Sequence, residues 1–403
     1  MANTLVTCSI VAKESLAILK NMLTFSKAVN RDWEDEYTDN MSRGYAPGTT
    51  ISIKKPPRYT YRAGRVAVPQ ATVETTVPLV LSQGGCDINF TGLERTVSLR
   101  RLEYKIQAAM APVANEIDRQ GCSLAHYSTF NALNTTGALP TSQALALAAV
   151  TDMNTRLDQM GAPRDKRRSL ISNPKMNGSL IQGFAGLFNN SQTIGKQFQS
   201  GLMVDSLGVA YAMDQNVDTH TNGAGTASNV NGANQTGSSV TVQATGAGTI
   251  TRGTVVTFVG CNSVNPQNRT DTGSLMNFVI TADVAQGATS LPISPAIVTS
   301  GAFQNVTASP TTGQAFVIIG AASVSYGCNV AFHKDAFTLA MVPMFAPTAG
   351  KGVVDVAQQT SDGFTIKVTQ IYDGINDNYI MRLDVLFGWA ATYPELSVKY
   401  YTV

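Results

Sequence analysis

Apolar residues recur at steps of three and four positions in three segments of the chain, from Ser9 to Phe25, from about Leu93 to Tyr127 and from about Thr141 to Met160. This spacing places them on one face of an α-helix. The middle segment has the best pattern, and its apolar face consists of Leu102, Ile106, Ala109, Met110, Val113 and Ile117. We expect three amphipathic helices, the second a long spine of about 30 residues, or roughly 45 Å.

Single residues predict the ends of the third helix and an irregularity in the second. Thr141 or Ser142 can cap the amino end of the third helix, and Gly161 is typical of the position that ends one. Pro112 lies inside the second pattern. Because proline lacks an N–H and its ring meets the carbonyl four residues earlier, we expect a kink near Ala108.

Alternating apolar and polar positions predict a two-stranded arm. One strand covers Thr49–Lys55, and the other runs from Thr72 to Leu81 and stops before Gly84 and Gly85. The tip is basic and aromatic and contains Lys54, Lys55, Arg58, Tyr59, Tyr61, Arg62 and Arg65. Because an isolated hairpin is marginally stable in water, the arm is expected to lie on another surface, most economically a neighbouring copy. Contact with nucleic acid is the alternative that interleaved basic and aromatic residues leave open.

Further strands are predicted in the second half of the chain. Phe364–Tyr372 and Tyr379–Trp389 alternate and are joined by turn residues, which is typical of antiparallel strands. Arg168–Ser172 predicts a short strand, followed by a helix after Asn173 and Pro174. The segment that begins at Phe332 predicts a strand or a short helix.

Composition changes abruptly between Thr221 and Ala322. The charged residues in this stretch are Arg252, Arg269, Asp271 and Asp283 alone, whereas about a quarter of an ordinary globular sequence is charged. Residues 221–239 form a low-complexity run with the composition of a flexible linker. Short strand-like pieces follow, and charged, helix-capable sequence flanks the stretch. We therefore expect an all-β module inserted into a larger α+β domain.

Length and charge bound the class of protein. The 403 residues allow about two or three domains. The net charge of +2 is no general signature of a nucleic-acid binder, and a charged fraction of only 14% suits a subunit that buries much of its surface against neighbours. The amino-terminal residues do not resemble a signal peptide, and no apolar run is long enough to span a membrane.

The residues that usually carry chemistry are sparse. The five cysteines are an odd, widely spaced set, which predicts reduced thiols and synthesis in the cytoplasm: Cys8, Cys86, Cys122, Cys261 and Cys328. The histidines, His126, His220 and His333, are far apart in sequence and lack metal-ligand spacing. No nucleophile elbow, phosphate loop or dinucleotide fingerprint is present. We expect no catalytic, cofactor-binding or metal-binding residues, and no cofactor.

Two clusters of like charge remain. The acidic cluster is a solvated turn or an arm that docks a basic partner, and it contains Asp32, Glu34, Asp35, Glu36 and Asp39. The basic run between the third helix and the following strand is expected to be a solvated loop, and it contains Arg164, Lys166, Arg167 and Arg168.

Several local sequences and the order of the predicted elements carry a resemblance. The sequences are Leu102–Met110, Leu157–Pro163, Leu170–Met176, Ile250–Phe258, Ala331–Phe337 and Arg382–Trp389. With its helical arm, basic-tipped hairpin, spine helix, β module and closing strands, the chain resembles the major capsid proteins of tailed double-stranded DNA bacteriophages with the HK97 fold. The inserted module makes it most similar to the P22-like coat protein branch. The resemblance spans essentially the whole chain, although Pro112 departs from an uninterrupted spine.

The resemblance implies an α+β, HK97-like capsid fold with an inserted all-β domain. It divides the chain into an N-terminal arm at 1–49, an extended-loop hairpin at 50–90, a peripheral domain with the spine helix at 91–130 and 376–403, an axial domain at 131–221 and 323–375, and the inserted domain at 222–322. The extended loop would lie across the adjacent subunit.

The resemblance further implies a structural shell protein, not an enzyme, that self-assembles as pentamers and hexamers of an icosahedral head around double-stranded DNA. Expected partners are other copies of the chain, a scaffolding protein, a portal protein, DNA bound without sequence preference and decoration proteins, but no membrane. The expected location is the virion capsid, assembled in the host bacterial cytoplasm. The expected intersubunit contact residues of the extended loop are Lys54, Lys55, Arg58, Tyr59, Arg62 and Arg65, and those expected to dock the scaffold are Glu14, Glu34, Asp35 and Glu36.

Alternatives from other classes stay open at this point. A β-rich tail or adhesion protein would use the uncharged module to bind a host ligand, and an encapsulin-type shell would enclose enzyme cargo in place of a genome. Images of the purified protein would separate closed shells from fibres.

Overall fold

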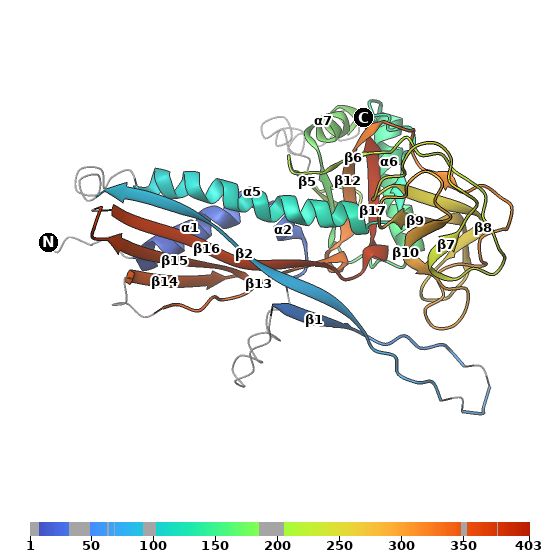
Figure 1. The fold of residues 1–403 in the computed structure, drawn as a ribbon, viewed down its shortest axis with the longest axis horizontal. Helices are drawn as coiled ribbons and strands as arrows, with labels where there is room; N and C mark the ends of the chain where they lie inside the picture. The colour runs from blue at the N-terminus through green and yellow to red at the C-terminus, as the bar shows by residue number, and fades with distance from the viewer. Residues whose placement is uncertain are drawn as a thin grey trace. The chain divides into compact units, whose positions relative to one another are not determined.

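The computed structural model describes residues 8–31, 49–62, 64–67, 69–91, 102–184, 205–347, 353–376 and 378–403, and Figure 1 labels most of their helices and strands. The chain divides into two compact units. The first unit comprises Met1–Ile53, Thr76–Gly121 and Thr338–Ala390, and the second comprises Lys54–Thr75, Cys122–Phe337 and Ala391–Val403. The five predicted domain boundaries stay predictions, because each unit combines several of these segments.

A six-stranded sheet organises the first unit. Its order is β1 (Thr50–Lys55), β2 (Thr75–Thr91), β16 (Asn378–Ala391), β15 (Phe364–Asp373) and β14 (Val353–Ser361), with β13 (Phe337–Met341) also paired to β16. Helix α1 (Cys8–Met22) packs on β14 and β15, and the short α2 (Phe25–Ala28) follows it. Ile51 and Ile53 are buried and their neighbours exposed, so the alternating pattern of β1 is confirmed.

The predicted end of the second strand of the arm is wrong. Strand β2 passes through Gly84 and Gly85 and pairs antiparallel with β16 as far as Thr91. A Cβ atom on Gly85 would lie 2.3 Å from the carbonyl oxygen of Leu383. Here glycine therefore permits a close approach between strands and is not a strand breaker.

Helix α5 (Leu102–Ser128) corresponds to the predicted spine, and the boundary between the two units falls inside it. It runs unbroken through Pro112, because a single missing N–H removes only one hydrogen bond of the helical ladder. The kink at Ala108 stays a prediction. Gly121 lies where α5 meets the aromatic rings of Phe25 and Trp389.

The second unit contains a mixed sheet covered by two helices. The sheet order is β3 (Ala132–Leu133), β17 (Ser397–Thr402), β12 (Ser325–His333), β4 (Arg168–Ser172) and β5 (Val209–Met213), with β6 (Thr219–Thr221) also paired to β12. The helices are α6 (Gln143–Gln159) and α7 (Pro174–Phe184), and they share a hydrophobic core with the sheet. The predicted ends of α6 are confirmed, since Ser142 Oγ accepts a hydrogen bond from the Leu145 N–H and Gly161 has a positive φ of 78°.

The uncharged stretch forms a second sheet in the same unit. Its five strands, all antiparallel, have the order β11 (Val317–Ile318), β8 (Val255–Val264), β9 (Asp271–Ile280), β10 (Ser290–Ile297) and β7 (Gly237–Thr241). The hydrophobic core of this sheet also takes in Phe130 and Met160, which precede the stretch. The predicted strands are confirmed, whereas the separate inserted domain stays a prediction because its core is shared.

The low-complexity run is fastened to this sheet rather than free. Val230 forms a bridge with Val242, and Asn229 forms one with Ala315. Val230 is only 2% exposed, so an apolar anchor holds a segment whose composition is otherwise that of a linker.

The structure also bears on the cysteines, on membrane-spanning helices and on metal-binding groups. All five cysteines are free thiols, as predicted. No helix among the described residues has the length and apolar content needed to cross a membrane. The described part of the chain also contains no group of three or more His, Cys, Asp or Glu side chains placed to hold a metal ion.

Candidate intersubunit contact site on the extended loop

The predicted contact residues lie on Lys54–Thr75, which we call the loop segment and which belongs to the second unit. Strand β1 ends at Lys55 because Pro56 and Pro57 have no N–H to continue a ladder. The following residues are irregular, and the predicted end of the first strand before the basic, aromatic tip is confirmed. Side-chain hydrogen bonds replace the ladder, as Gln70 Oε1 accepts from the Thr60 N–H at 2.8 Å and Gln70 Nε2 donates to the Thr60 carbonyl at 2.8 Å.

The base of the loop segment is held by an ion pair within the chain. Arg58 Nη2 lies 2.8 Å from Glu395 Oε1, and the two side chains are 34% and 21% exposed. The guanidinium of Arg58 also lies over the ring of Phe303, 5.7 Å from its centroid. Arg58 was expected to pair with an adjacent subunit. In the single chain it has a carboxylate partner of its own, and the intersubunit role stays a prediction.

Lys55 is the second cation at this base. Its Nζ lies 5.0 Å from the ring centroid of Tyr393. Burial lowers the pKa of Lys55, Glu395 raises it, and the positive charge of Arg58 lowers it. A hollow of about 400 Å³ adjoins the pair, and its lining includes apolar side chains such as Phe130, Met160, Val264, Met276 and Phe303.

Arg269, one of the few charged residues of the uncharged stretch, binds the loop segment. Its Nη2 donates hydrogen bonds to the carbonyl of Tyr59 at 3.2 Å and to that of Ala302 at 3.3 Å. Tyr59 is also tied to the returning arm of the segment, because its hydroxyl lies 2.9 Å from Thr72 Oγ1. The backbone at Tyr59 is therefore fixed while half of the residue, 52%, stays exposed.

The outer part of the loop segment carries cations without acidic partners. Arg62 and Arg65 are exposed and form no ion pair with any residue that the structure describes, and the same holds for Lys54 in β1. Arg62 Nη1 donates instead to the carbonyls of Gly64 and Val66. Exposed apolar side chains lie beside these cations, with Tyr61 92% and Val66 78% exposed. Such a surface can bind carboxylates and bury apolar area when another chain covers it.

Of the predicted scaffold-docking residues, Glu14 alone lies in the part of the chain that the structure describes. Glu14 is half-buried on α1. Glu34, Asp35 and Glu36 lie outside the described residues. The scaffold contact therefore stays a prediction.

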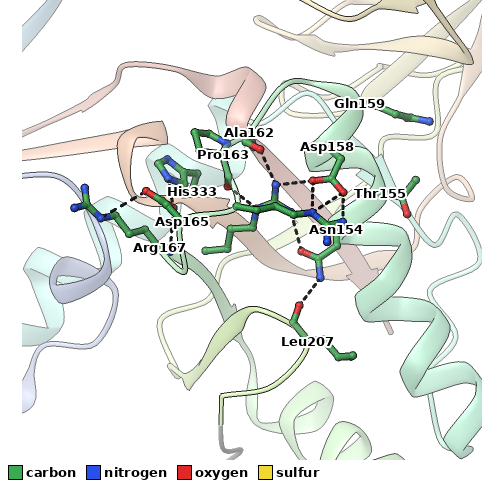
Figure 2. Close-up of polar contacts among 12 residues, drawn as sticks. Asn154, Thr155, Asp158, Gln159, Ala162, Pro163, Asp165, Arg167, Leu207 and His333 are labelled. Atoms are coloured by element: carbon green, nitrogen blue, oxygen red, sulfur yellow. Dashed lines mark hydrogen bonds and ion pairs between the residues drawn. The ribbon is translucent and has the colours of Figure 1, made fainter.

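The basic run after α6 is only partly the solvated loop that was predicted. Arg164, Lys166 and Arg167 are exposed, but Arg168 is 2% exposed. Its Nη2 lies 2.6 Å from Asp158 Oδ1, its Nη1 donates to Asn154 Oδ1 at 3.1 Å, and the carbonyls that accept its remaining bonds are those of Ala162 and Pro163 (Figure 2). Hydrogen bonds from Arg164 and Arg168 lower the pKa of Asp158, and burial opposes them. Arg168 is the first residue of β4, in which four of the five residues are buried, and its charge alone could not indicate that position.

Sequence reasoning also missed two groupings of histidine. His333 is 1% exposed and its Nε2 lies 3.0 Å from Asp165 Oδ1 (Figure 2). His126 and His220 come together with ring centroids 4.9 Å apart, although 94 positions separate their numbers in the chain. The partners of the loop segment, Glu395, Phe303 and Arg269, were missed for the same reason, since no local signal joins such distant positions.

Comparison with known proteins identifies the family. The model of the family described as "P22 coat protein - gene protein 5" matches residues 92–400. No curated protein sequence matches the chain. Solved structures with similarity include one of Mycobacterium phage Che8, at 14% identity and a TM-score of 0.49, covering 94% of this chain and 90% of that one. The mature capsid of bacteriophage PhiM1 gives 9% identity and a TM-score of 0.44, covering 89% of this chain and 83% of that one.

The capsid structure of cyanophage P-SCSP1u gives 10% identity and a TM-score of 0.42, covering 89% of this chain and 85% of that one. The family assignment rests on the family model, which covers more than half of the sequence and includes the spine helix, the uncharged stretch and the closing strands. The chain belongs to the P22 coat protein family.

Proposed function

We propose that the chain assembles as pentamers and hexamers of an icosahedral phage head that encloses double-stranded DNA, and that the loop segment supplies one of the contacts between adjacent subunits. Membership of the coat protein family makes the chain a structural component of a phage capsid. The proposal adds the geometry of assembly to that role. Assembly takes place in the cytoplasm of the host, with a scaffolding protein, a portal protein and decoration proteins as further partners.

The exposure of the loop segment is the observation that carries the proposal. A coat subunit must present surfaces that are stable in water before assembly and covered afterwards. Arg62 and Arg65 are exposed cations without an acidic partner among the described residues, and Tyr61 and Val66 add apolar area beside them. Arg58 is different, because Glu395 already neutralises it. We therefore assign the base to positioning the loop and the outer cations to binding the adjacent subunit.

Charge reversal tests this division. Arg62→Glu combined with Arg65→Glu changes no ion pair among the described residues, so the variant subunit should keep its far-ultraviolet circular dichroism and its urea midpoint. It should nevertheless remain as free subunits, because two attractive contacts per copy become repulsive and a closed lattice repeats the change many times. Sedimentation velocity and negative-stain imaging distinguish shells from free subunits.

Lys175→Glu is the matched control, since Lys175 is an exposed cation at the start of α7, away from the loop segment. Shells of normal size and yield from the double variant would exclude the outer cations as contact residues. Failure of Lys175→Glu to assemble as well would show that assembly responds to net charge rather than to this surface.

A further inference from the structure

A buried cluster of basic groups joins four separate parts of the second unit. It consists of His126 from the end of α5, His220 from β6, Lys399 from β17 and the turn at Gly253 that precedes β8. His126 is 1%, His220 4% and Lys399 0% exposed. Lys399 Nζ donates hydrogen bonds to the carbonyls of His126 at 3.0 Å and of Gly253 at 3.3 Å. The lysine thus fastens the amino end of β8 to α5 through main-chain oxygens.

Among the described residues, no carboxylate lies within ion-pair distance of this cluster. His126, His220, Lys399 and Arg252 form no ion pair with any residue in the described ranges. His220 Nε2 lies 3.1 Å from Thr254 Oγ1, and His126 Nδ1 is buried without a hydrogen-bond partner in that part of the chain. A neutral imidazole is tolerated in such a place. A charged imidazole has no carboxylate within ion-pair distance, in the described part of the chain, to offset its lost hydration.

The charged and titratable groups around the two rings are mostly cationic or weakly acidic. Those that face them or Lys399 are Arg252 and Tyr127 on the side of the turn, Cys328 of β12, Tyr401 of β17, Asp218 before β6 and Asp283, which lines the same hollow as His220. Burial lowers the pKa of His126 well below its usual value, and Lys399, His220 and Arg252 lower it further. Burial followed by Lys399 lowers the pKa of His220 to about 4.

Protons have a path to the cluster. A hollow of about 530 Å³ is lined by His220, Tyr127, Arg252 and Asp283 together with several threonines. The guanidinium of Arg252 lies over the ring of Tyr127, 4.4 Å from its centroid, at this hollow. The imidazole of His220 therefore adjoins a polar space, although most of its surface is covered.

We propose that His126, His220 and Lys399 form an acid-sensitive joint, in which protonation of the two imidazoles crowds three cations into one buried space and releases the Gly253 turn from α5 and β17. The joint holds at neutral pH, when both rings are uncharged and Lys399 is the cation that the carbonyls bind. In acid, the five-stranded sheet loosens at the amino end of β8 while the rest of its core stays packed.

The direction of the pH dependence follows from proton binding. Both histidines bind protons more weakly in the folded chain than in the unfolded chain, so their contribution to stability is complete above about pH 6.5 and is lost as the pH falls toward the folded-state value. For His220, with a folded-state pKa of about 4, the folding equilibrium constant should fall about 30-fold between pH 8 and pH 5. His126, whose pKa is also lowered by burial, should add a further loss in the same direction.

Urea unfolding of the full-length free subunit at about pH 8 and about pH 5 tests the joint. The wild-type midpoint should fall in acid, and the fall should shrink in Lys399→Met, which removes the central charge, and in His126→Asn combined with His220→Asn. His333→Gln is the matched control, because His333 is equally buried but faces Asp165 and Asp335, and it should keep the wild-type fall. An equal fall in the wild type and in the double histidine variant would overturn the proposal.

A second measurement needs no variant of the cluster. The chain has three histidines, so labelling histidine with ¹³C gives three ring signals, and His333→Gln removes the one outside the cluster. The two remaining signals should stay in the neutral form until well below their ordinary titration range. The proposal would be overturned if both rings titrated near pH 6.5 and the amide exchange of residues 250–256 stayed the same across that titration.

Discussion

The guanidinium of Arg58 and the carboxylate of Glu395 join two parts of the chain that are 337 positions apart, with Nη2 and Oε1 separated by 2.8 Å. Both side chains are partly covered, so the pair is screened less than a surface pair. This contact fixes where the loop segment leaves the body of the second unit. It therefore determines the direction in which the outer cations are presented.

A double-mutant cycle measures this contact. Arg58→Ala, Glu395→Gln and the combination should give a coupling free energy of about 1 kcal/mol in urea unfolding. The pair Arg119–Glu116 on α5 is the control, because its side chains are 57% and 47% exposed. Its coupling should be at most about 0.5 kcal/mol. Equal couplings would mean that Glu395 does not hold the loop segment.

Removal of the buried guanidinium of Arg168 should destabilise the second unit strongly. Arg168→Met takes one of its two cations from Asp158, which keeps Arg164, and leaves the carbonyls of Ala162 and Pro163 without the donors of Arg168. We expect a loss of about 3–5 kcal/mol, measured as the free energy of unfolding in urea. Arg167→Ala, at a side chain 62% exposed, should change stability by less than about 0.5 kcal/mol. A similar small loss at both positions would contradict the buried network.

Replacement by alanine should change the stability of the fold in opposite directions at two glycines that lie in helices. A Cβ on Gly121 would lie 2.6 Å from Trp389 Cζ2 and 2.7 Å from Phe25 Cδ1, so Gly121→Ala forces two aromatic rings apart and should destabilise by about 1–3 kcal/mol. Gly178 in α7 has no atom within 4 Å of the same position. Gly178→Ala should stabilise by about 0.5–1 kcal/mol because alanine is the better helix former. Thermal unfolding of both variants gives the sign directly.

Thiol reactivity should single out one cysteine. Burial raises the pKa of Cys261 and of Cys328 to about 12, so neither forms the reactive thiolate at neutral pH. Cys8 and Cys122 are buried as well, whereas Cys86 is half-buried on β2. Brief treatment of the folded subunit with iodoacetamide should add one label, and treatment in urea should add five. Mass spectrometry counts the labels, and rapid labelling of Cys261 would contradict the described core.

Local signals account for what the sequence predicts correctly. The cap at Ser142, the stop at Gly161 and the alternation of Ile51 with Ile53 each lie within one element, and each is confirmed. The errors arise from contacts between distant positions. Gly85 reads as a strand end until Leu383 is placed against it, and nothing near it in sequence indicates that strand.

In the candidate site, too, local features can be predicted from the sequence and contacts between distant positions cannot. The basic and aromatic character of the loop segment is visible in sequence, and it leads to Arg62 and Arg65 directly. The partner of Arg58 is not visible, since Glu395 is an ordinary acidic residue near a proline until the fold brings it to the loop. Buried polar groups such as Lys399 are equally hidden, because nothing near Lys399 in sequence indicates that every residue of β17 is buried.

Strands β6 and β12 pair so that Thr221 faces Ser325, with their hydroxyl oxygens 2.7 Å apart. Residues 222–324 lie between these two positions in sequence and include the whole five-stranded sheet. This segment therefore begins and ends at neighbouring points of the mixed sheet. A tight turn of about two residues spans the same gap. Replacement also requires a cover for Phe130 and Met160, which now pack into the sheet. With that cover supplied, replacement of residues 222–324 by such a turn would test whether the mixed sheet folds without them.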